Sequence, residues 1–177
     1  WVDGVIEGPL ANLSSGSSNI AIGNGSQRSI AAGGNNVCIG YGTLKSSTTG
    51  NNNTAVGHLA LDSVSTGTNN IGIGESAGHD ISTGRFNTCI SPNEAGKSLT
   101  TGEFNVYMGY LSIAGSGSRT GAIVIGSGNR GHTDKGNSTG FINPDLGGVY
   151  QGNNSSSWST TSDRMIKKNI IDNNLGL

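Results

Sequence analysis

Glutamates are the residues of this chain that could carry hydrolytic chemistry, and they are few. Glu75, Glu94 and Glu103 could pair across neighbouring turns of a repetitive fold. Glycan-cleaving enzymes hold two such carboxylates roughly 5 to 9.5 Å apart. No aromatic groove accompanies these glutamates in the sequence. Cleavage of a glycan is therefore the alternative prediction, and our main expectation is a protein that is not an enzyme.

The histidines and cysteines are isolated in the sequence. Cys38 and Cys89 are three repeats apart along the chain. Three coils would separate them by about 14 Å, beyond the roughly 7 Å limit between the Cα atoms of a disulfide. We therefore expect free thiols, which suits assembly in a reducing host cytoplasm. The histidines lack the spacing of metal ligands, so we expect surface side chains and neither metal nor cofactor. They are His58, His79 and His132.

Charge rises abruptly near the end of the chain. The segment SDRMIKKNI, residues 162–170, sets Ser162 and Asp163 before Arg164, Lys167 and Lys168, after a chain that is mostly Gly, Ser, Thr and Asn. Taken alone, it reads as the start of a short amphipathic helix capped by Ser162 or Asp163. The change in composition indicates a change of domain.

The composition excludes several classes of protein. Only 32% of the 177 residues are hydrophobic and 31 are glycine, which is too little apolar material for an ordinary layered core. The net charge of -1 and the 12% of charged residues provide no basic patch for nucleic acid or lipid headgroups. No apolar run approaches the roughly 20 residues of a membrane span. Because the first residue is Trp1, we expect a fragment of a longer protein.

An internal repeat, Gly-x-x-Asn-x-x-aliphatic-Gly, runs through most of the chain. The spacings between successive asparagines are 17, 17, 17, 17 and 18, and a further 17 reaches Ala122 in a weaker copy. Such a period is typical of a solenoid, whereas the same composition in random order would form a flexible linker. The one longer step coincides with SPNEAG, where we expect a one-residue bulge. The repeated asparagines are Asn19, Asn36, Asn53, Asn70, Asn87 and Asn105.

Each repeat predicts one coil of an all-β parallel β-roll, with two short strands and two turns. We expect the asparagines to stack into a ladder of amide hydrogen bonds between coils about 4.8 Å apart, a structural role. The glycine three residues before each asparagine is expected at a corner that needs positive φ. Because side chains alternate between faces, the large aliphatic ones are expected to fill the roll. These are Ile20, Ile22, Val37, Ile39, Ile71, Ile73, Val106, Met108, Ile123 and Ile125.

The central residue of each strand is small or apolar and is expected to point away from the interior. Such a column would leave an uncovered flat patch on a single chain. We therefore predict a homo-oligomer in which identical columns meet around an axis. That it is a homotrimer is implied only by the family resemblance given below. The alternative is a column of small residues that faces solvent without a partner. The predicted interface residues are Ala21, Cys38, Ala55, Gly72 and Cys89, continued by Tyr107 and Val124.

The repeat divides the chain into four parts. We expect an N-terminal connection over residues 1–14, the solenoid of about seven coils over 15–127, a non-repeat distal tip over 128–161, and a further domain that begins at 162–177. The tip holds Phe141, Tyr150 and Trp158, whose rings are candidates for contact with a host receptor or glycan. The same rings could instead pack at the trimer axis.

The strand pattern N-x-A-(I/V)-G resembles the head repeats of trimeric autotransporter adhesins, in which three parallel β-rolls pack side by side, although those repeats are usually shorter. It is also similar to the repeats of phage and large-virus fibre proteins. The resemblance covers about residues 15 to 127. It implies the architecture, and it leaves open a viral fibre, an enzymatic tailspike and a bacterial adhesin head.

The closing segment resembles the junction that begins the self-cleaving, endosialidase-type intramolecular chaperone of phage tail fibres and tailspikes. Ser162, Asp163 and Lys167 match that motif, as do Asn169 and Ile170. The resemblance implies that a chaperone follows, aligns three chains and is released by cleavage between Ser162 and Asp163. It makes the Ser162 hydroxyl the nucleophile and Lys167 or Lys168 the base.

Two departures from the motif and one property of the repeat complete the prediction. Met165 stands where the family usually has arginine and Ile166 where it has leucine, so we expect slow cleavage. Because slipping three chains by one repeat costs little, an aligning clamp is needed, and cleavage would then trap the assembly kinetically. The predicted protein is a virion fibre that binds a host receptor, without nucleic acid or membrane insertion.

Overall fold

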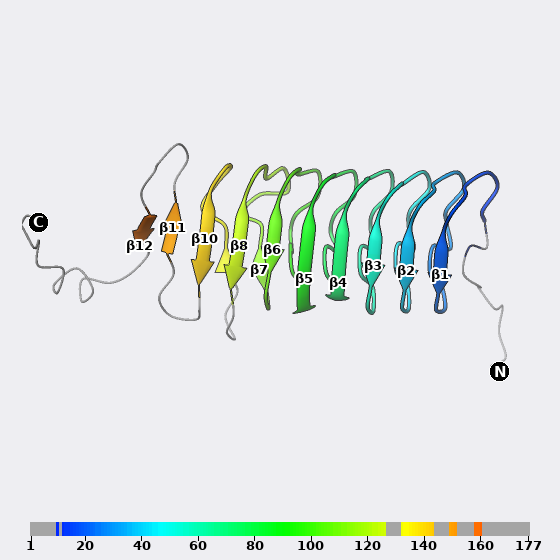
Figure 1. Cartoon of the computed structure of the whole chain (residues 1–177), viewed down its shortest axis with the longest axis horizontal. Coiled ribbons are helices and arrows are strands. Elements are labelled where there is room, and N and C mark those ends of the chain that lie inside the picture. Colours follow the sequence, from blue (N-terminus) through cyan, green and yellow to red (C-terminus); the bar gives the residue numbers. More distant parts are fainter. Residues whose placement is uncertain (1–9, 11, 127–131, 144–148, 152–157, 161–177) are drawn as a thin grey trace, which may run out of the picture.

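The computed structural model describes residues 10, 12–126, 132–143, 149–151 and 158–160. It is an all-β parallel solenoid of about seven coils, each the length of one sequence repeat, and no helix occurs in these ranges. Figure 1 shows its strands side by side in chain order along the long axis, and the predicted fold class is confirmed. The parallel strands are β1 Ile20–Ile22, β2 Val37–Ile39, β3 Thr54–Val56, β4 Ile71–Glu75, β5 Thr88–Asn93, β6 Val106–Met108, β8 Ile123–Gly126 and β10 Gly140–Asn143.

The strands pair in the register that the sequence period predicts. Ile20 is opposite Val37, and the same one-repeat step relates β2 to β3, β3 to β4 and β4 to the start of β5. Between β5 and β6 the step is longer by one, since Thr88 is opposite Val106. Each coil therefore hydrogen-bonds its backbone to the coils before and after it, which satisfies the strand amides without any second layer.

The longer coil contains the expected bulge, within the extension of β5. Ile73 is opposite Ile90, but Glu75 is opposite Asn93, so one extra residue has entered between these pairs. Pro92 lies in this stretch. The Asn93 N–H donates to Ser91 Oγ at 2.9 Å. The bulge is thus held locally, and the ordinary period resumes after β6, with Val106 opposite Ile123.

The sequence predicts a second strand in every coil. In the structure, the side of each coil opposite the sheet, here called the wall, is mostly built of turns instead. A second strand pairing occurs only near the end of the described solenoid, between β7 Ser112–Ile113 and β9 His132–Thr133. In the earlier coils this wall is built of turns with left-handed residues at alternate positions, such as Leu59 with φ 54° and Leu61 with φ 52°. The turns still bond from coil to coil, as the Leu61 N–H does to the Ala77 carbonyl at 3.0 Å.

The asparagine ladder is present and buried, as predicted. Asn70 Nδ2 donates to Asn53 Oδ1 at 3.2 Å and to the Gly84 carbonyl at 2.9 Å. Its own Oδ1 accepts the backbone N–H of Asn87 at 3.1 Å and Asn87 Nδ2 at 3.0 Å. The side-chain amide of Asn70 is thus fully bonded inside a dry interior, which offsets the cost of burying it. From Asn36 to Asn105 the ladder side chains are fully buried.

The inside and the outside of the strands are reversed relative to the prediction. Ile20 and Ile22 are 51% and 59% exposed, and their row faces outward. The central residues face the core instead. The reason is that side chains alternate between the two faces of a strand. Because the asparagine is buried, the central residue two positions after it is buried too. The predicted interface is therefore interior: Ala21 is partly buried, and Cys38, Ala55, Gly72, Cys89, Tyr107 and Val124 are buried.

The corner glycines also have a reason other than the predicted one. They do not adopt positive φ; the left-handed residue is the one just before each ladder asparagine, such as Asn52 with φ 56°. A Cβ on any corner glycine would instead come closer than 3.0 Å to the backbone carbonyl of the next coil, as at Gly84 against Gly102. Glycine is required because the coils approach closely there. These corners are Gly16, Gly33, Gly50, Gly67, Gly84 and Gly102.

The sheet continues past the boundary expected at residue 127. β10 pairs in parallel with β8, with Gly140 opposite Ile123, again a step of one repeat. β11 Val149–Gln151 and β12 Trp158–Thr160 then add to the same sheet in antiparallel order. Phe141, expected at an exposed tip, is 4% exposed and packs in the core, under the Lys135 ammonium at 4.8 Å from its ring centroid. Phe141 therefore packs inside a single chain, which is neither the exposed tip nor the trimer axis considered for it.

Replacing Asn70 with alanine is expected to lower the free energy of unfolding by about 2 to 4 kcal/mol. The change removes the partners of the Gly84 carbonyl and of both Asn87 donors, and each unsatisfied buried group costs roughly 1–3 kcal/mol. Urea unfolding followed by circular dichroism measures the effect. Thr66→Ala, at an exposed position of the same coil, is the matched control. Equal midpoints for the two variants would contradict a stabilising ladder.

Candidate interaction surface

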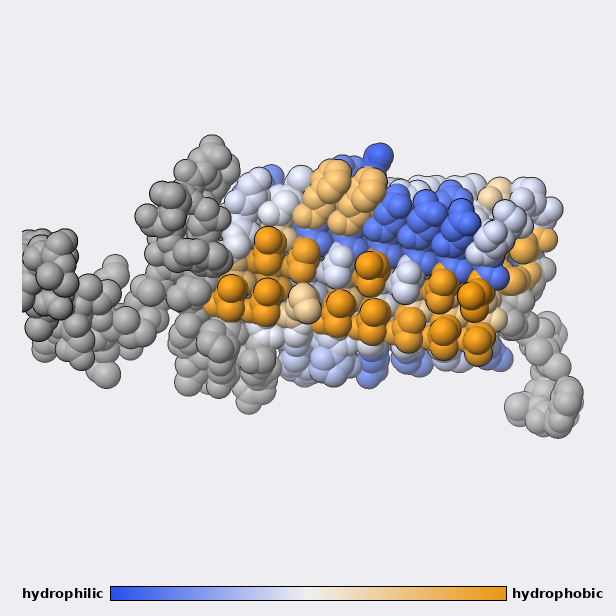
Figure 2. Space-filling model, in the orientation of Figure 1, coloured by the Kyte–Doolittle hydropathy of each residue, from blue (hydrophilic) through white to orange (hydrophobic). Residues whose placement is uncertain are grey.

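The outward side chains of the parallel strands form one continuous apolar surface, here called the isoleucine face. Figure 2 shows it as two rows along the solenoid, one mostly orange and the other interrupted by pale side chains. The rows arise because the first and third residues of each strand point outward and repeat in register. One row is Ile20, Val37, Thr54, Ile71, Thr88, Val106 and Ile123, and the other is Ile22, Ile39, Val56, Ile73, Ile90, Met108, Ile125 and Ile142.

The isoleucine face is unusual for a parallel sheet, because such sheets are normally covered on both faces. Eight strands spaced about 4.8 Å apart make it roughly 34 Å long. Isoleucines at the two ends remain well exposed, with Ile22 at 59% and Ile125 at 41%. An exposed apolar patch of this length is a candidate site of association. The sequence signal that identifies the isoleucine face is the buried asparagine, because the residues one and three places after it point to the opposite side of the strand.

The residues predicted for self-cleavage lie outside the described part of the chain. Ser162, Asp163, Lys167 and Lys168 all fall in the range 161–177. Tyr150 and Trp158 belong to the backbones of β11 and β12, but the contacts expected of their side chains also lie outside what the structure describes. These assignments therefore remain predictions.

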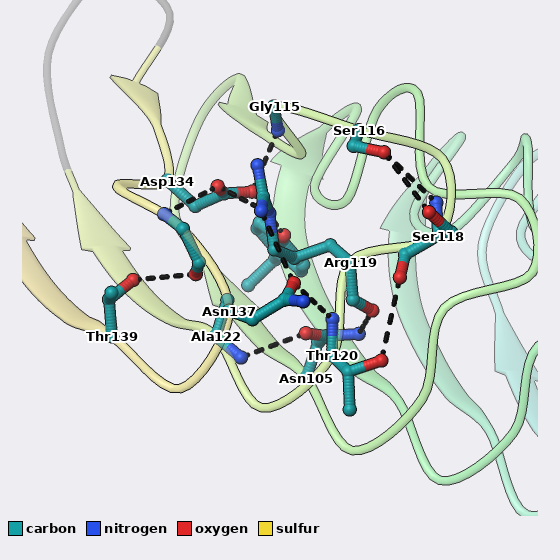
Figure 3. A network of polar contacts seen from close by, with 12 residues as sticks. Asn105, Gly115, Ser116, Ser118, Arg119, Thr120, Ala122, Asp134, Asn137 and Thr139 are labelled. Carbon is teal, nitrogen blue, oxygen red and sulfur yellow. Dashed lines mark hydrogen bonds and ion pairs between the residues drawn. The ribbon is translucent and has the colours of Figure 1, made fainter. Parts of the chain in front are cut away.

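A buried polar network closes the described end of the solenoid (Figure 3). The Asp134 carboxylate has no exposed area and accepts the Tyr107 hydroxyl at 2.8 Å and the Gly115 N–H at 2.7 Å through Oδ2. Its Oδ1 lies 2.6 Å from Arg119 Nε. Arg119 Nη1 in turn donates to Asn137 Oδ1 at 3.2 Å. Burial, followed by the hydrogen bond to Asp134, raises the pKa of Tyr107 well above its usual range.

This network begins where the ladder ends. Asn105 Oδ1 accepts the backbone N–H of Ala122 at 2.9 Å, as ladder oxygens do in earlier coils, but it receives no side-chain amide because Ala122 replaces the ladder asparagine. Asn105 Nδ2 donates to the Arg119 carbonyl at 2.7 Å. Arg119 thus receives the last bond of the ladder through its backbone and pairs with Asp134 through its side chain. The arrangement is a structural termination and brings together no nucleophile and base.

A small charged depression lies beside the longer coil, lined by Ser76, His79, Asp80, Glu94 and Lys97. His79 Nδ1 is 3.1 Å from Asp80 Oδ1, and Lys97 Nζ is 2.9 Å from Glu94 Oε2. Partial burial of Asp80 works to raise its pKa, but the hydrogen bond from the Ser98 N–H, together with His79 and Lys97, lowers it overall. Charges of both signs are already paired within this depression.

Of the carboxylates considered for hydrolysis, Glu75 and Glu94 lie in neighbouring coils, where the Glu94 N–H donates to the Glu75 carbonyl at 3.0 Å. Glu94 pairs with Lys97, while Glu103 pairs with Arg85 at 2.8 Å. Glu75 is exposed at the end of β4. Among the described residues, no group of three or more His, Cys, Asp or Glu side chains could hold a metal ion.

Both cysteines are free thiols buried in the core, as the spacing predicted. Burial raises the pKa of Cys38 and of Cys89 to about 12 from an ordinary value of 9.0. Because the thiolate is the reactive form, both side chains are inert in the folded protein. They act as small apolar residues of the core column.

The fold and the isoleucine face define a class, a parallel β-solenoid with one uncovered apolar sheet face. No protein-family model matches the chain, and comparisons with curated proteins and with solved structures find no match. Within the described ranges, no helix is long and apolar enough to cross a membrane.

Stability is expected to fall as the pH rises from about 9 towards 12. Since the folded thiols hold their protons up to about 12, the unfolded chain ionises first, and the stabilisation present below pH 9 is progressively lost. Urea midpoints of the parent and of the double variant Cys38→Ala, Cys89→Ala measure this across the same pH range. The parent should lose more stability than the variant. Parallel pH profiles would contradict the prediction.

Proposed function

We propose that this chain is a structural segment of a trimeric fibre that attaches a virion to a host cell, with the isoleucine face as the contact between its three chains. The observation that carries the proposal is the double row of exposed aliphatic side chains on the parallel sheet. Burying such apolar area is worth about 25 cal/mol per Å², so association along the whole face is strongly favourable.

The geometry of the face supports parallel chains around one axis. Its two rows run the length of the described solenoid and carry almost no charge, so identical faces meet without repulsion. Three is the number of chains implied by the resemblance of the repeats to trimeric fibres. A cyclic arrangement keeps all chains in one direction, which places their closing segments together at the same end for an aligning chaperone. A pair related by a two-fold axis across the solenoid would separate them.

The rest of the molecule suits a rigid, passive element. The ladder satisfies the buried amides coil by coil, and Glu94 and Glu103 are each paired with a cation. Receptor contact and maturation by self-cleavage belong to the same proposal, and they rest on the resemblance of the repeats and of the closing segment.

Light scattering of the protein made from the full-length gene, in which the proposed chaperone can align the chains, is expected to give the mass of three chains, and Ile73→Glu is expected to give a single chain. Each trimer of the variant would bury three unpaired carboxylates, at several kcal/mol each. Because Ile73 faces outward, the variant should keep its β-sheet circular dichroism. Thr66→Glu, at an exposed corner, is the matched control.

Ala55→Arg tests whether the central strand residues face the core or a neighbouring chain. Ala55 is fully buried in the core, so arginine there is expected to prevent folding rather than to yield a folded single chain. A parent that is monomeric at every concentration, or an Ile73→Glu variant that stays trimeric, would contradict the proposed interface.

In the full-length gene product, cleavage is expected after Ser162, with Met165→Arg faster than the parent. The expectation follows from the motif that residues 162–170 share with self-cleaving fibre chaperones. Intact-mass spectrometry gives the new C-terminus, and Ser162→Ala should leave the chain whole. A mature chain that ends elsewhere, or cleavage that persists in Ser162→Ala, would refute this junction.

A further inference from the structure

Two exposed phenylalanines interrupt an otherwise polar column of the solenoid. The column consists of the residue just before each ladder position, where the backbone is left-handed with φ between 53° and 68°. Phe86 and Phe104 occupy it in adjacent coils, on either side of the longer repeat. The remaining members are small or are amides: Ser18, Asn35, Asn52, Asn69, Gly121 and Ser138.

The two phenylalanines are poorly suited to this position by local chemistry. Asparagine and glycine adopt left-handed φ readily, whereas a bulky side chain there is an outlier. The rings do not compensate by filling the core, since Phe86 is 45% and Phe104 is 56% exposed. Because core packing does not offset the unfavourable backbone, and both rings keep exposed area, the pair is a candidate for a role in binding.

The rings form an ordered platform with polar groups at its edge. Their centroids are 4.9 Å apart and their planes differ by 2°, so the pair stacks along the solenoid axis. Beside it, Arg85 Nε and Glu103 Oε1 lie 2.8 Å apart, with the Arg85 side chain 55% exposed. In the next coil the column residue is Gly121, which has no side chain to cover the outer face of Phe104.

The geometry points to a carbohydrate-binding site, in which the apolar C–H face of a pyranose ring stacks on Phe104 above Gly121. The exposed guanidinium of Arg85 and the carboxylate of Glu103 supply donors and acceptors for hydroxyl groups. Because these two charges neutralise one another, the site favours an uncharged sugar. The inference gives a location and a ligand class to the host attachment proposed above, and it rests on that function.

A second protein chain fits this platform less well. Two partly exposed rings offer roughly 200 Å², far below the about 800 Å² that each partner contributes to a stable protein interface. Figure 2 shows two pale-orange side chains at the edge of the sheet face, with a hydrophilic strip between them and the apolar rows. The platform is therefore distinct from the isoleucine face.

Saturation-transfer NMR on the 177-residue chain tests the site with three methyl β-glycosides: those of galactose, glucose and N-acetylglucosamine. At least one is expected to receive saturation at the ring protons of its apolar face. Phe104→Asn should weaken that binding about tenfold, the loss of one aromatic contact. Asparagine is the residue that three other coils use in this column, so this variant should fold and melt no lower than the parent.

Two further variants test whether binding depends on the outer face of Phe104 or on any exposed aromatic ring. Gly121→Asn keeps both rings and is expected to weaken binding by covering the outer face of Phe104; the nearest atom to its Cβ is Ser138 Oγ at 3.3 Å, and asparagine tolerates the φ of 68°. Tyr41→Asn removes another exposed ring, which stacks on His58, and is expected to change nothing.

Three outcomes decide against the site. Silence of all three glycosides overturns the inference, as does binding that Phe104→Asn leaves unchanged. A Phe104→Asn chain that loses its trimeric mass by light scattering, with no glycoside bound by the parent, would make the pair a protein contact. Binding by a monomeric parent would retain the platform while the trimer proposal fails, so the two failures are distinguishable.

Discussion

The sharing of each buried asparagine amide between neighbouring coils is the constraint on which the rest of the structure depends. Asn53 Nδ2 donates to Asn36 Oδ1 on one side and to the Gly67 carbonyl on the other. These bonds hold the coils at strand spacing, and the corners must then come so close that only glycine fits. A dry interior makes every member necessary, because an unpaired amide there is costly.

The ladder also decides which surface the protein presents. With the asparagine inside, strand parity places the small central residues inside and the branched aliphatic residues outside. The interior of such a thin coil has room for Ala55 and Cys38. Solvent exposure of Ile22 and Ile73 is therefore a consequence of burying the asparagine ladder on the core side of the strands, and it gives a narrow molecule a long apolar face.

Unusual side chains occur close to the two irregularities of the repeat, the extra residue and the missing ladder asparagine. The extra residue near Pro92 lies between Phe86 and Phe104, and the loss of the asparagine at Ala122 coincides with the carboxylate of Asp134. In a chain of near-identical units, a residue that departs from the repeat gives its coil a property that the other coils lack. The stacked rings and the buried ion pair are the two clearest cases.

The sequence alone determined the period, the parallel coils, the ladder, the bulge and the separation of the thiols, because each follows from local spacing repeated along the chain. Only the tertiary structure decided which strand face is interior, since alternation groups Ile20 with Ile22 but does not say which side of the sheet closes into the roll. It alone also showed that Phe141 is packed and that Phe86 and Phe104 stack. Those facts depend on contacts between coils, which no single repeat contains.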